Sequence, residues 1–401
     1  MISDLNSIFS ESAQGMKRSA IREILKLTQQ PDIISFAGGL PAPESFPVND
    51  IAEVTQEVIQ EKGTAALQYG TTEGFVPLRE ELLKRYKAEG LDVELDNLII
   101  TTSSQQGLDL LGKIFINRGD KVICGLPSYL GGLSAFRTYG AQLEGIEFDE
   151  HGMRSDMLEA KLKAMKNAGE KPKFIYIIPD FQNPAGITMP EFRRREILDL
   201  AHKYDVLIVE DSPYRELRFD GEAQPMLYQM DNTGHVITLG TFSKILAPGF
   251  RISWVMAAPE IADKFVIAKQ AADLCTPPFV QMIAARYMEK NLLEKNLKET
   301  INAYRIKRDT MLEGFRNHMP DGVSWTEPEG GLFLFLYLPD HMDAEAIFEK
   351  AIEKKVAYVL GSVFHCNGKG QNTMRLNFSF PTLEQNKEGV KKLADLIREN
   401  M

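Results

Sequence analysis

Lys244 stands in a sequence context that is unusual for a lysine. It lies within HVITLGTFSKILAPGFR (235–251), where it follows an apolar run and is surrounded by hydroxyl side chains, Phe242 and a Pro-Gly turn. Most lysines are solvated surface charges, but an amine held in an apolar setting can attack a carbonyl group and form an imine. The sequence therefore predicts a chemical role for Lys244.

Other side chains that could carry chemistry follow predicted strands. Asn183 lies in DFQNPAG after the run KFIYIIP, and Asp211 closes the run VLIVE, with Tyr214 three residues later. A carboxylate at the end of so apolar a strand is unfavourable to bury without a cationic or hydrogen-bonding partner. Open parallel sheets bind ligands at the carboxyl ends of their strands, which favours one shared site. Ordinary turn chemistry at Asn183 and turn capping by Asp211 are the alternatives.

A further group of residues is suited to holding a phosphate. The segment SSQQG follows the predicted strand NLIITT and opens an amphipathic helix, so free backbone N–H groups, Ser103, Ser104 and Gln105 could donate to an anion. Ser243 precedes the lysine described above, and Arg251 follows it by seven residues. Simple N-capping by one of the two serines is the alternative for that turn.

Together these residues provide the groups that pyridoxal 5′-phosphate requires. Its aldehyde forms an imine with a lysine, and its pyridine nitrogen needs an acidic partner for the ring to withdraw electrons. Hydroxyl, guanidinium and helix N-terminal groups suit its phosphate. The sequence therefore predicts pyridoxal 5′-phosphate as the cofactor.

Composition limits the classes of partner. The chain has 401 residues, 44% of them hydrophobic, and a formal net charge of −10, which argues against nucleic acid or an anionic membrane as a partner. The amino terminus does not resemble a secretory signal, and no apolar stretch reaches the roughly 20 residues needed to span a bilayer. Cys124, Cys275 and Cys366 are isolated in sequence, which favours a reducing, cytoplasmic location.

Motifs of other enzyme classes are missing from the sequence. It contains no G-x-x-x-x-G-K-[ST], no G-x-G-x-x-G that opens a helix, no G-x-S-x-G and no H-E-x-x-H. The six histidines are dispersed at spacings unlike those of a metal site, so we expect hydrogen-bonding or surface roles for them and no metal. Nucleotide, serine-hydrolase and zinc chemistry are therefore disfavoured.

Hydrophobic periodicity predicts an α/β fold. Short apolar runs such as KVICGLP, KFIYIIP and VITLGT alternate with amphipathic helical stretches, a pattern typical of a doubly wound, mostly parallel sheet covered on both faces. After Pro278 a long stretch without glycine or proline predicts one long or broken helix. We expect a large α/β domain over 46–290 and a small α+β domain over 291–401, joined by the segment 1–45.

The order of these residues resembles a known enzyme family. Asn183, Asp211-x-x-Tyr214, Ser243-Lys244 and Arg251 are followed by a late arginine in MRLNFS, as in fold-type I pyridoxal-phosphate aminotransferases of class I/II. FAGGLPAPESFP, LQYGTTEGFVPLRE and TTSSQQGLDLL look most like the branch that holds 2-aminoadipate, kynurenine and multi-substrate aminotransferases and the aminotransferase-like domain of MocR-type regulators. The resemblance runs from about residue 20 to the end.

The resemblance implies a role for each matching position. Lys244 would hold the cofactor, Asp211 would keep its pyridine nitrogen protonated, and Tyr129 would stack on the ring. Asn183 and Tyr214 would bind the ring's phenolic oxygen. The positions implied for the phosphate are Ser103, Ser104, Gln105, Ser243, Arg251 and, from a second subunit, Tyr69.

On the substrate side the resemblance implies that Arg375 holds the α-carboxylate, with Asn183 and the backbone of Gly39 nearby. Its planar fork suits a bidentate carboxylate in a way that lysine cannot match. Arg22 in SAIREILKL could favour an acidic side chain, although a surface helix position is the alternative. Because one tyrosine would serve the neighbouring site, we expect a homodimer with shared active sites.

The implied function is transfer of an amino group between an L-amino acid and a 2-oxo acid, with 2-oxoglutarate expected as the acceptor, by a ping-pong mechanism. A C–S lyase or decarboxylase would need the same lysine and aspartate and is the first alternative. A regulator-type ligand-sensing domain is the second, but the residues before Phe36 are too few for a winged helix and linker, and the charge is acidic.

Overall fold

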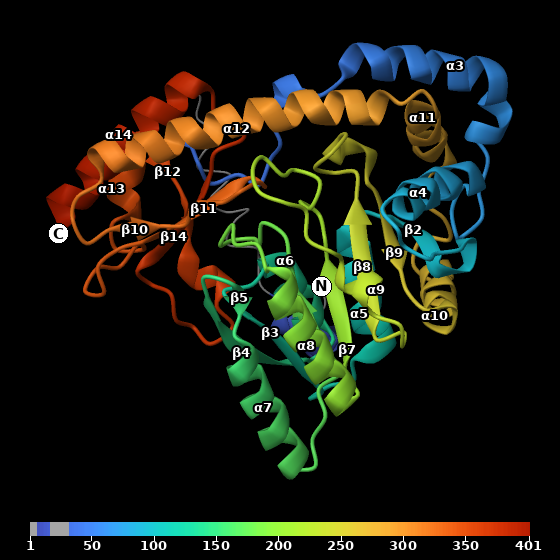
Figure 1. The fold of residues 1–401 in the computed structure, drawn as a ribbon, viewed down its shortest axis with the longest axis horizontal. Coiled ribbons are helices and arrows are strands. Elements are labelled where there is room, and N and C mark those ends of the chain that lie inside the picture. Colours follow the sequence, from blue (N-terminus) through green and yellow to red (C-terminus); the bar gives the residue numbers. More distant parts are fainter. Residues whose placement is uncertain (1–5, 17–31) are drawn as a thin grey trace.

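The computed structural model describes residues 6–16 and 32–401. An eight-stranded sheet forms its centre, in the order β2-β9-β8-β7-β6-β3-β4-β5 (Figure 1). The strands are β2 (Leu98–Thr102), β3 (Lys121–Leu126), β4 (Gln142–Asp149), β5 (Gly152–Met153), β6 (Phe174–Ile177), β7 (Leu207–Asp211), β8 (Val236–Thr241) and β9 (Ile252–Met256). Strands β4, β3, β6, β7 and β8 pair in parallel, whereas β9 is antiparallel to β2 and β8, and β5 to β4. The predicted α/β class is confirmed.

Helices cover both faces of this sheet. They are α4 (Val76–Ala88), α5 (Ser104–Phe115), α6 (Leu130–Thr138), α7 (Ser155–Asn167), α8 (Glu191–Tyr204), α9 (Leu227–Met230) and α10 (Pro259–Gln270), whereas α3 (Val48–Ala66) lies farther out and packs against the helix over residues 278–289. Ile175 and Ile208 pack in the core formed with α7 and α8, whereas Tyr176 and Val209 pack in the core formed with α5 and α6. Because neighbouring residues of one strand enter different cores, the strands read as continuous apolar runs.

The stretch after Pro278 forms two helices, α11 (Pro278–Glu289) and α12 (Leu292–His318). They separate at Asn291, whose φ of 55° lies in the left-handed region and ends one helical path before the next begins. Of the two forms predicted from sequence, the broken helix is therefore correct. Helix α12 runs along the upper edge of the molecule toward the C-terminal elements (Figure 1).

A smaller sheet lies at the C-terminal end, in the order β10-β11-β14-β13. Its strands and the elements beside it are β10 (Ser324–Trp325), β11 (Phe333–Tyr337), β13 (Val359–Leu360), β14 (Thr373–Asn377), α13 (Phe348–Glu353) and α14 (Leu383–Asn400). Near the amino terminus, β1 (Ile34–Ser35) pairs in parallel with β12 (Val356–Ala357). The apolar run VAYVLGSVF (356–364) therefore supplies β12 to one sheet and β13 to another.

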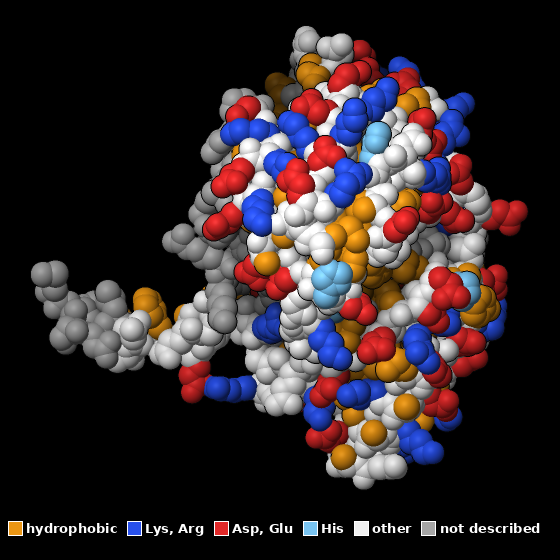
Figure 2. Space-filling view, turned by 90° about the vertical axis from the view of Figure 1, so that its left-hand side faces the viewer, with side chains coloured by type: hydrophobic (Ala, Val, Ile, Leu, Met, Phe, Trp, Pro, Cys, Tyr) orange, Lys and Arg blue, Asp and Glu red, His pale blue; other side chains and the backbone are white. Residues whose placement is uncertain are grey.

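The remaining elements are short. They are α1 (Glu11–Gly15), η1 (Asn6–Ile8), η2 (Pro43–Ser45), η3 (Leu95–Asn97), η4 (Pro248–Phe250) and η5 (Gly361–Phe364). Within residues 6–16 and 32–401, none of the helices combines the length and apolar character needed to cross a membrane. Acidic and basic side chains are interspersed on the face shown in Figure 2, and apolar side chains gather near its centre.

Two of the cysteines that are isolated in sequence meet in the fold. Cys124 lies in β3, and its Sγ is 3.8 Å from the Sγ of Cys366, which follows η5. All three cysteines are free thiols. The contact joins the large sheet to the C-terminal part of the chain, an approach that sequence spacing does not predict.

Candidate active site

The carboxyl ends of the parallel strands bring most of the predicted residues together. Asp211 is the last residue of β7, and Lys244 follows β8 by three residues. Asn183 follows β6, and Ser103 and Ser104 follow β2 at the start of α5. Since β6, β7 and β8 are parallel neighbours, residues after their ends share one edge of the sheet.

Asp211 is a buried carboxylate with one free oxygen. Its Oδ2 accepts a 2.7 Å hydrogen bond from the hydroxyl of Tyr176, while its Oδ1 is buried with no hydrogen-bond partner. Burial raises the pKa of Asp211 to about 6, and the Tyr176 hydrogen bond opposes that shift. The group is therefore ionised at neutral pH, and its open oxygen can bind a cationic N–H donor.

Two adjacent glycines on α6 make room for the aromatic side chains near this carboxylate. A Cβ on Gly132 would lie 2.9 Å from the ring of Tyr176, and a Cβ on Gly131 would lie 2.5 Å from the ring of Tyr129. Real Cβ atoms essentially never approach so closely, so the motif Tyr-Leu-Gly-Gly is required for both rings to keep their positions. Tyr129 was predicted from the sequence, whereas Tyr176 was not.

Replacing Tyr176 by phenylalanine should weaken cofactor binding at acidic pH. Since the hydroxyl holds down the pKa of Asp211, its loss raises that pKa, and the carboxylate charge disappears at a higher pH. A hydrogen bond to a charged group is worth about 1.5–3 kcal/mol, so the shift should be about one to two pH units. Cofactor affinity of the apoprotein, titrated between pH 5 and 8, measures it.

Tyr287→Phe is the matched control, because the hydroxyl of Tyr287 on α11 is buried without a partner. We expect this variant to keep the wild-type pH dependence of cofactor affinity. An unchanged profile in Tyr176→Phe would show that the hydroxyl does not tune the carboxylate.

Lys244 is a half-buried amine with a neutral partner. Its Nζ donates a 2.8 Å hydrogen bond to the carbonyl oxygen of Gly39. Burial, followed by the positive charges of Arg375 and Arg251, lowers the pKa of Lys244 to about 8. A lysine with this pKa has a substantial neutral fraction near neutral pH, so it can act as nucleophile and base.

Arg375 is a buried cation that forms no ion pair with any carboxylate in the described ranges. Its Nη1 donates to Asn183 Oδ1 at 3.1 Å and its Nη2 to the carbonyl of Ala37 at 2.9 Å, while Nε has no partner. The rings of Phe333 and Phe364 flank the guanidinium, with their centroids 4.3 and 5.1 Å from its Cζ. Burial lowers the pKa of Arg375 to about 10. A buried guanidinium in this state is suited to bind a carboxylate.

Asn183 connects the two halves of this site. Its Nδ2 donates to the hydroxyl of Tyr214 at 3.3 Å, and its Oδ1 accepts from Arg375. Tyr214 is 4% exposed and meets the ring of Phe333 edge-on, with 5.7 Å between centroids. The amide therefore lies between a phenol near the aspartate and the buried guanidinium.

The residues predicted for a phosphate lie around the start of α5. Ser103 occupies the N-cap position with a left-handed φ of 72°, but its side chain does not cap the helix, so the capping alternative is wrong for this residue. Ser104 Oγ donates to Ser253 Oγ at 3.3 Å, and Gln105 Nε2 donates to the carbonyl of Gly131 at 3.1 Å.

Two further phosphate candidates lie at the turn after β8. Arg251 is exposed, its Nη1 donates to Pro248 O at 3.2 Å, and its carbonyl accepts from the N–H of Ser103 at 2.9 Å. The N–H of Ser243 donates to Thr241 Oγ1 at 3.0 Å. The backbone contact from Arg251 joins this turn to the start of α5, so both groups face the same end of the sheet.

Two predicted residues are not assembled with the others. Tyr69 is 79% exposed after the end of α3, where its hydroxyl is available to another molecule. Arg22 lies outside the described residues.

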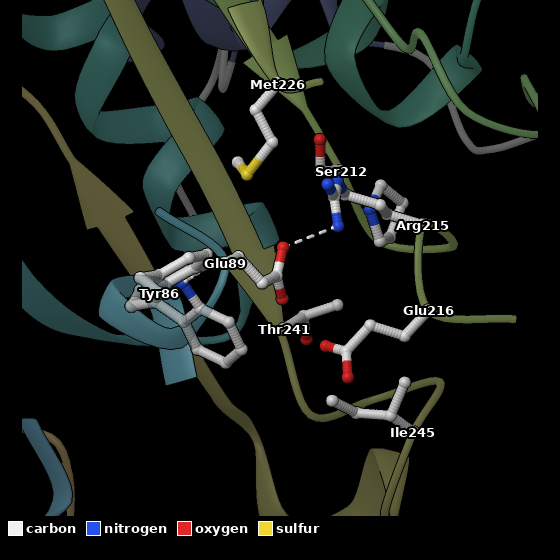
Figure 3. A pocket seen from close by; sticks show the side chains of 10 residues that line it. Tyr86, Glu89, Ser212, Arg215, Glu216, Met226, Thr241 and Ile245 are labelled. Carbon is white, nitrogen blue, oxygen red and sulfur yellow. Dashed lines mark hydrogen bonds and ion pairs between the residues drawn. The ribbon is translucent and has the colours of Figure 1, made fainter. Parts of the chain in front are cut away.

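A small cavity beside the turn after Asp211 is too small to be the substrate site (Figure 3). Its volume is about 20 Å³, which is enough for about one water molecule. Arg215 Nη1 donates across it to Glu89 Oε2 at 2.8 Å, while Ser212 Oγ and Arg215 Nε have no partner. Its polar lining is consistent with a buried solvent position.

The assembled residues fit pyridoxal phosphate. The unpaired oxygen of Asp211 matches a protonated pyridine nitrogen, the amine of Lys244 matches an aldehyde, and the start of α5 offers donors to a phosphate. Arg375 remains for a substrate carboxylate. This combination defines a pyridoxal-phosphate enzyme that acts on amino acids.

The chain belongs to the aminotransferases of class I and II, whose family description it matches over residues 31–393. It catalyses pyridoxal-phosphate-dependent transamination between an amino acid and a 2-oxo acid. The predicted family, cofactor and reaction are therefore confirmed.

Related proteins cover nearly the whole chain. Aromatic-amino-acid aminotransferase 1 of Thermococcus litoralis is 50% identical over 99% of this chain and 96% of its own length. Kynurenine aminotransferase of Pyrococcus horikoshii, solved with PMP, is 47% identical with a TM-score of 0.96 and covers 100% of this chain and 99% of its own. Alpha-aminoadipate aminotransferase of Thermus thermophilus was solved in complex with N-(5′-phosphopyridoxyl)-L-leucine. It is 38% identical with a TM-score of 0.91, and the match covers 99% of this chain and 98% of its own.

Proposed function

We propose that this aminotransferase uses an aromatic L-amino acid as amino donor and 2-oxoglutarate as acceptor. The observation that carries the substrate class is Arg375, a buried guanidinium without an acidic partner among the described residues, which suits the α-carboxylate that donor and acceptor share. The aromatic preference is supported by the names of two relatives, the aromatic-amino-acid aminotransferase and the kynurenine aminotransferase, at 50% and 47% identity.

The proposed roles follow from the contacts of each residue. Asp211 binds the pyridine nitrogen through Oδ1, Tyr129 stacks on the ring, and Asn183 and Tyr214 hold its phenolic oxygen. Residues of two turns hold the phosphate: Ser103, Ser104 and Gln105 at the start of α5, and Ser243 and Arg251 after β8. Tyr69 of the neighbouring subunit completes the phosphate site.

Bound pyridoxal phosphate supplies a carbonyl carbon that exchanges amines and a ring that withdraws electrons from the bond that breaks. Arg375 and the Gly39 backbone orient the substrate through its carboxylate. Lys244 Nζ, whose neutral fraction is increased because burial lowers its pKa to about 8, removes the proton from the substrate α-carbon. Asp211 stays ionised because the Tyr176 hydroxyl donates to it.

An amino-donor panel against 2-oxoglutarate tests this function. We expect the highest kcat/KM with tyrosine, phenylalanine or kynurenine and a smaller value with 2-aminoadipate. The 2-oxo acid product is measured separately from ammonia and CO₂, which would reveal lyase or decarboxylase activity. A marked preference for 2-aminoadipate or for branched donors would overturn the proposed substrate class but not the reaction.

Replacing Arg375 by lysine should lower kcat/KM for α-amino acids by about 10- to 100-fold. Lysine keeps the charge but loses the planar fork, and a charged hydrogen bond is worth about 1.5–3 kcal/mol. The rate with an arylalkylamine that lacks the carboxylate should change little, because it makes no such contact. An equal loss for both substrates would assign Arg375 a purely structural role.

We further propose a cytoplasmic homodimer in which Tyr69 reaches the phosphate bound by the partner subunit. Its 79% exposure leaves the ring free to enter a neighbouring molecule. Tyr69→Ala should lower cofactor affinity about 10- to 100-fold through loss of a charged hydrogen bond. Tyr204→Phe, a tyrosine at the end of α8, is the control.

Mixed dimers test whether the tyrosine acts across the interface. A dimer of one Lys244→Ala chain and one Tyr69→Ala chain should contain one site with both native residues. Its activity at limiting cofactor should exceed the mean of the two parent variants. Activity equal to that mean, or a fully active monomer in sedimentation, would contradict the shared site.

A further inference from the structure

A cluster of two imidazoles and a carboxylate lies at the opposite edge of the sheet from the candidate active site. His202 is near the end of α8, Asp231 follows α9, and His235 precedes the first residue of β8. One ligand atom from each lies within 4.8 Å of the others. The six residues of β8, at about 3.3 Å each, lie between His235 and the turn that carries Lys244, so the two sites are roughly 20 Å apart.

The hydroxyl of Thr233 lies at the centre of the cluster. Its Oγ1 is 2.6 Å from Asp231 Oδ1, 2.7 Å from His235 Nδ1 and 3.0 Å from His202 Nε2. His202 Nε2 is also 3.1 Å from Asp231 Oδ1. The backbone N–H groups of Thr233 and Val236 donate to the two oxygens of Asp231, which fixes the carboxylate.

The side chains of the cluster offer fewer donor hydrogens than their short contacts require as hydrogen bonds. His235 Nε2 is 3.2 Å from Asp205 Oδ1, and a carboxylate only accepts, so the neutral ring carries its proton there and presents a lone pair at Nδ1. The single proton of Thr233 then faces two acceptors, Asp231 Oδ1 and His235 Nδ1. With neutral imidazoles, one of these two short contacts has no proton.

A divalent cation would satisfy these lone pairs. Two imidazole nitrogens and a carboxylate oxygen form a typical donor set for Zn²⁺, which binds such ligands at about 2.0–2.2 Å. Ligands on a tetrahedral ion at that distance lie about 3.4 Å apart, close to the 3.1 Å between His202 Nε2 and Asp231 Oδ1. The contact from His235 to Asp205 is the carboxylate–imidazole pair that commonly orients a metal-binding histidine.

We propose that His202, Asp231 and His235 form a binding site for a divalent transition-metal ion, best matched by Zn²⁺, with Thr233 or water as a fourth ligand. The histidine spacing in sequence does not predict this site, because its ligands come from three separate elements. The ion joins the end of α8, the end of α9 and the start of β8, so its role is structural and not catalytic.

Zinc binding to the holoenzyme tests the proposal. After exposure to ZnCl₂ and exhaustive dialysis, one zinc per chain should be retained, and the midpoint of thermal unfolding should rise with zinc concentration. His235→Gln should weaken zinc affinity about 100-fold or more, and Asp205→Asn, which removes only the orienting carboxylate, about 10- to 100-fold. His151→Gln, a histidine beside Glu150, is the matched control and should bind zinc as the wild type does.

The free thiols offer zinc another position, so Cys366→Ser is measured in parallel. Zinc retention that is lost in Cys366→Ser but kept in His235→Gln would overturn the proposal. Failure of the wild-type holoenzyme to retain zinc would do the same. If His235→Gln does not fold, the zinc affinity of Asp205→Asn is compared with that of the wild type instead.

Discussion

Replacing Lys244 by alanine is expected to reduce transamination by at least about 10²- to 10⁴-fold, the range typical of a lost proton-transfer group. The variant also loses the amine that links the cofactor to the chain. Reduction of the wild-type holoenzyme with borohydride should leave the cofactor mass on the peptide containing Lys244. The same treatment of Lys244→Ala should leave that peptide unlabelled.

Lys269→Ala is a suitable control, because Lys269 is another buried lysine, paired at 2.6 Å with Asp273, and is not one of the residues predicted to bind cofactor or substrate. Its loss should lower stability while the borohydride label stays on Lys244. Full turnover by Lys244→Ala, or a label that moves to another lysine without loss of rate, would refute the assignment.

Asp211→Asn is expected to lower the activity of the enzyme but raise the stability of the apoprotein. Transamination and cofactor affinity should fall, with a rate loss of about 10²-fold or more, because the variant removes the charge that stabilises the protonated ring. The apoprotein should become more stable at neutral pH by about 1–3 kcal/mol, because a buried ionised carboxylate with an open oxygen is removed. Denaturant unfolding of both apoproteins measures the difference.

The pH dependence of that difference follows from the direction of the shift. The folded-state pKa of Asp211, about 6, is above the ordinary value of 3.8, so the folded state binds more protons than the unfolded state between these values. Stability of the wild-type apoprotein therefore falls as pH rises through this window, relative to the variant. The two should be similar below pH 4 and differ fully above pH 6.

Glu210→Gln is the matched control on the other face of β7. This buried carboxylate accepts from the N–H groups of Leu227 and Tyr228 and from the hydroxyl of Thr238. Burial raises the pKa of Glu210 as well, but the positive charge of Arg194 and these three hydrogen bonds oppose the shift. Because Glu210→Gln weakens these interactions, which Asp211 lacks, it should destabilise the protein while the cofactor affinity of the folded protein is retained. The same stability change in both variants would contradict the distinct environments of the two carboxylates.

The central strands β6, β7, β8 and β9 of the large sheet could be predicted because they are buried on both faces, which leaves an almost uninterrupted apolar run in the sequence. Element boundaries in the C-terminal part were harder to predict. The run from Val356 to Phe364 is mostly apolar, yet it contributes to two sheets and a 3-10 helix, and only its pairing with β1 and β14 decides where it divides. That pairing is tertiary information.

The strand-end residues of the site were predictable because polar side chains after apolar strands have few structural explanations. Tyr176 was missed because it lies inside an apolar strand, where an aromatic residue ordinarily indicates core. Phe333 and Phe364 were missed for the same reason, and Ala37 because it acts through its backbone carbonyl. Asn183 was identified from its place after a strand and Arg375 from the family resemblance, but no local pattern predicts the hydrogen bond that joins them across 192 positions.

The position of Asn183 between Tyr214 and Arg375 has a thermodynamic consequence. One amide supplies its N–H to a phenol and its oxygen to a guanidinium, so a molecule that pulls on either partner changes the hydrogen bond available to the other. The affinity for a carboxylate must then depend on occupancy next to the phenol, and the reverse dependence must have the same coupling free energy. The protein with cofactor bound and the apoprotein would thus bind the same small carboxylic acid with different affinities.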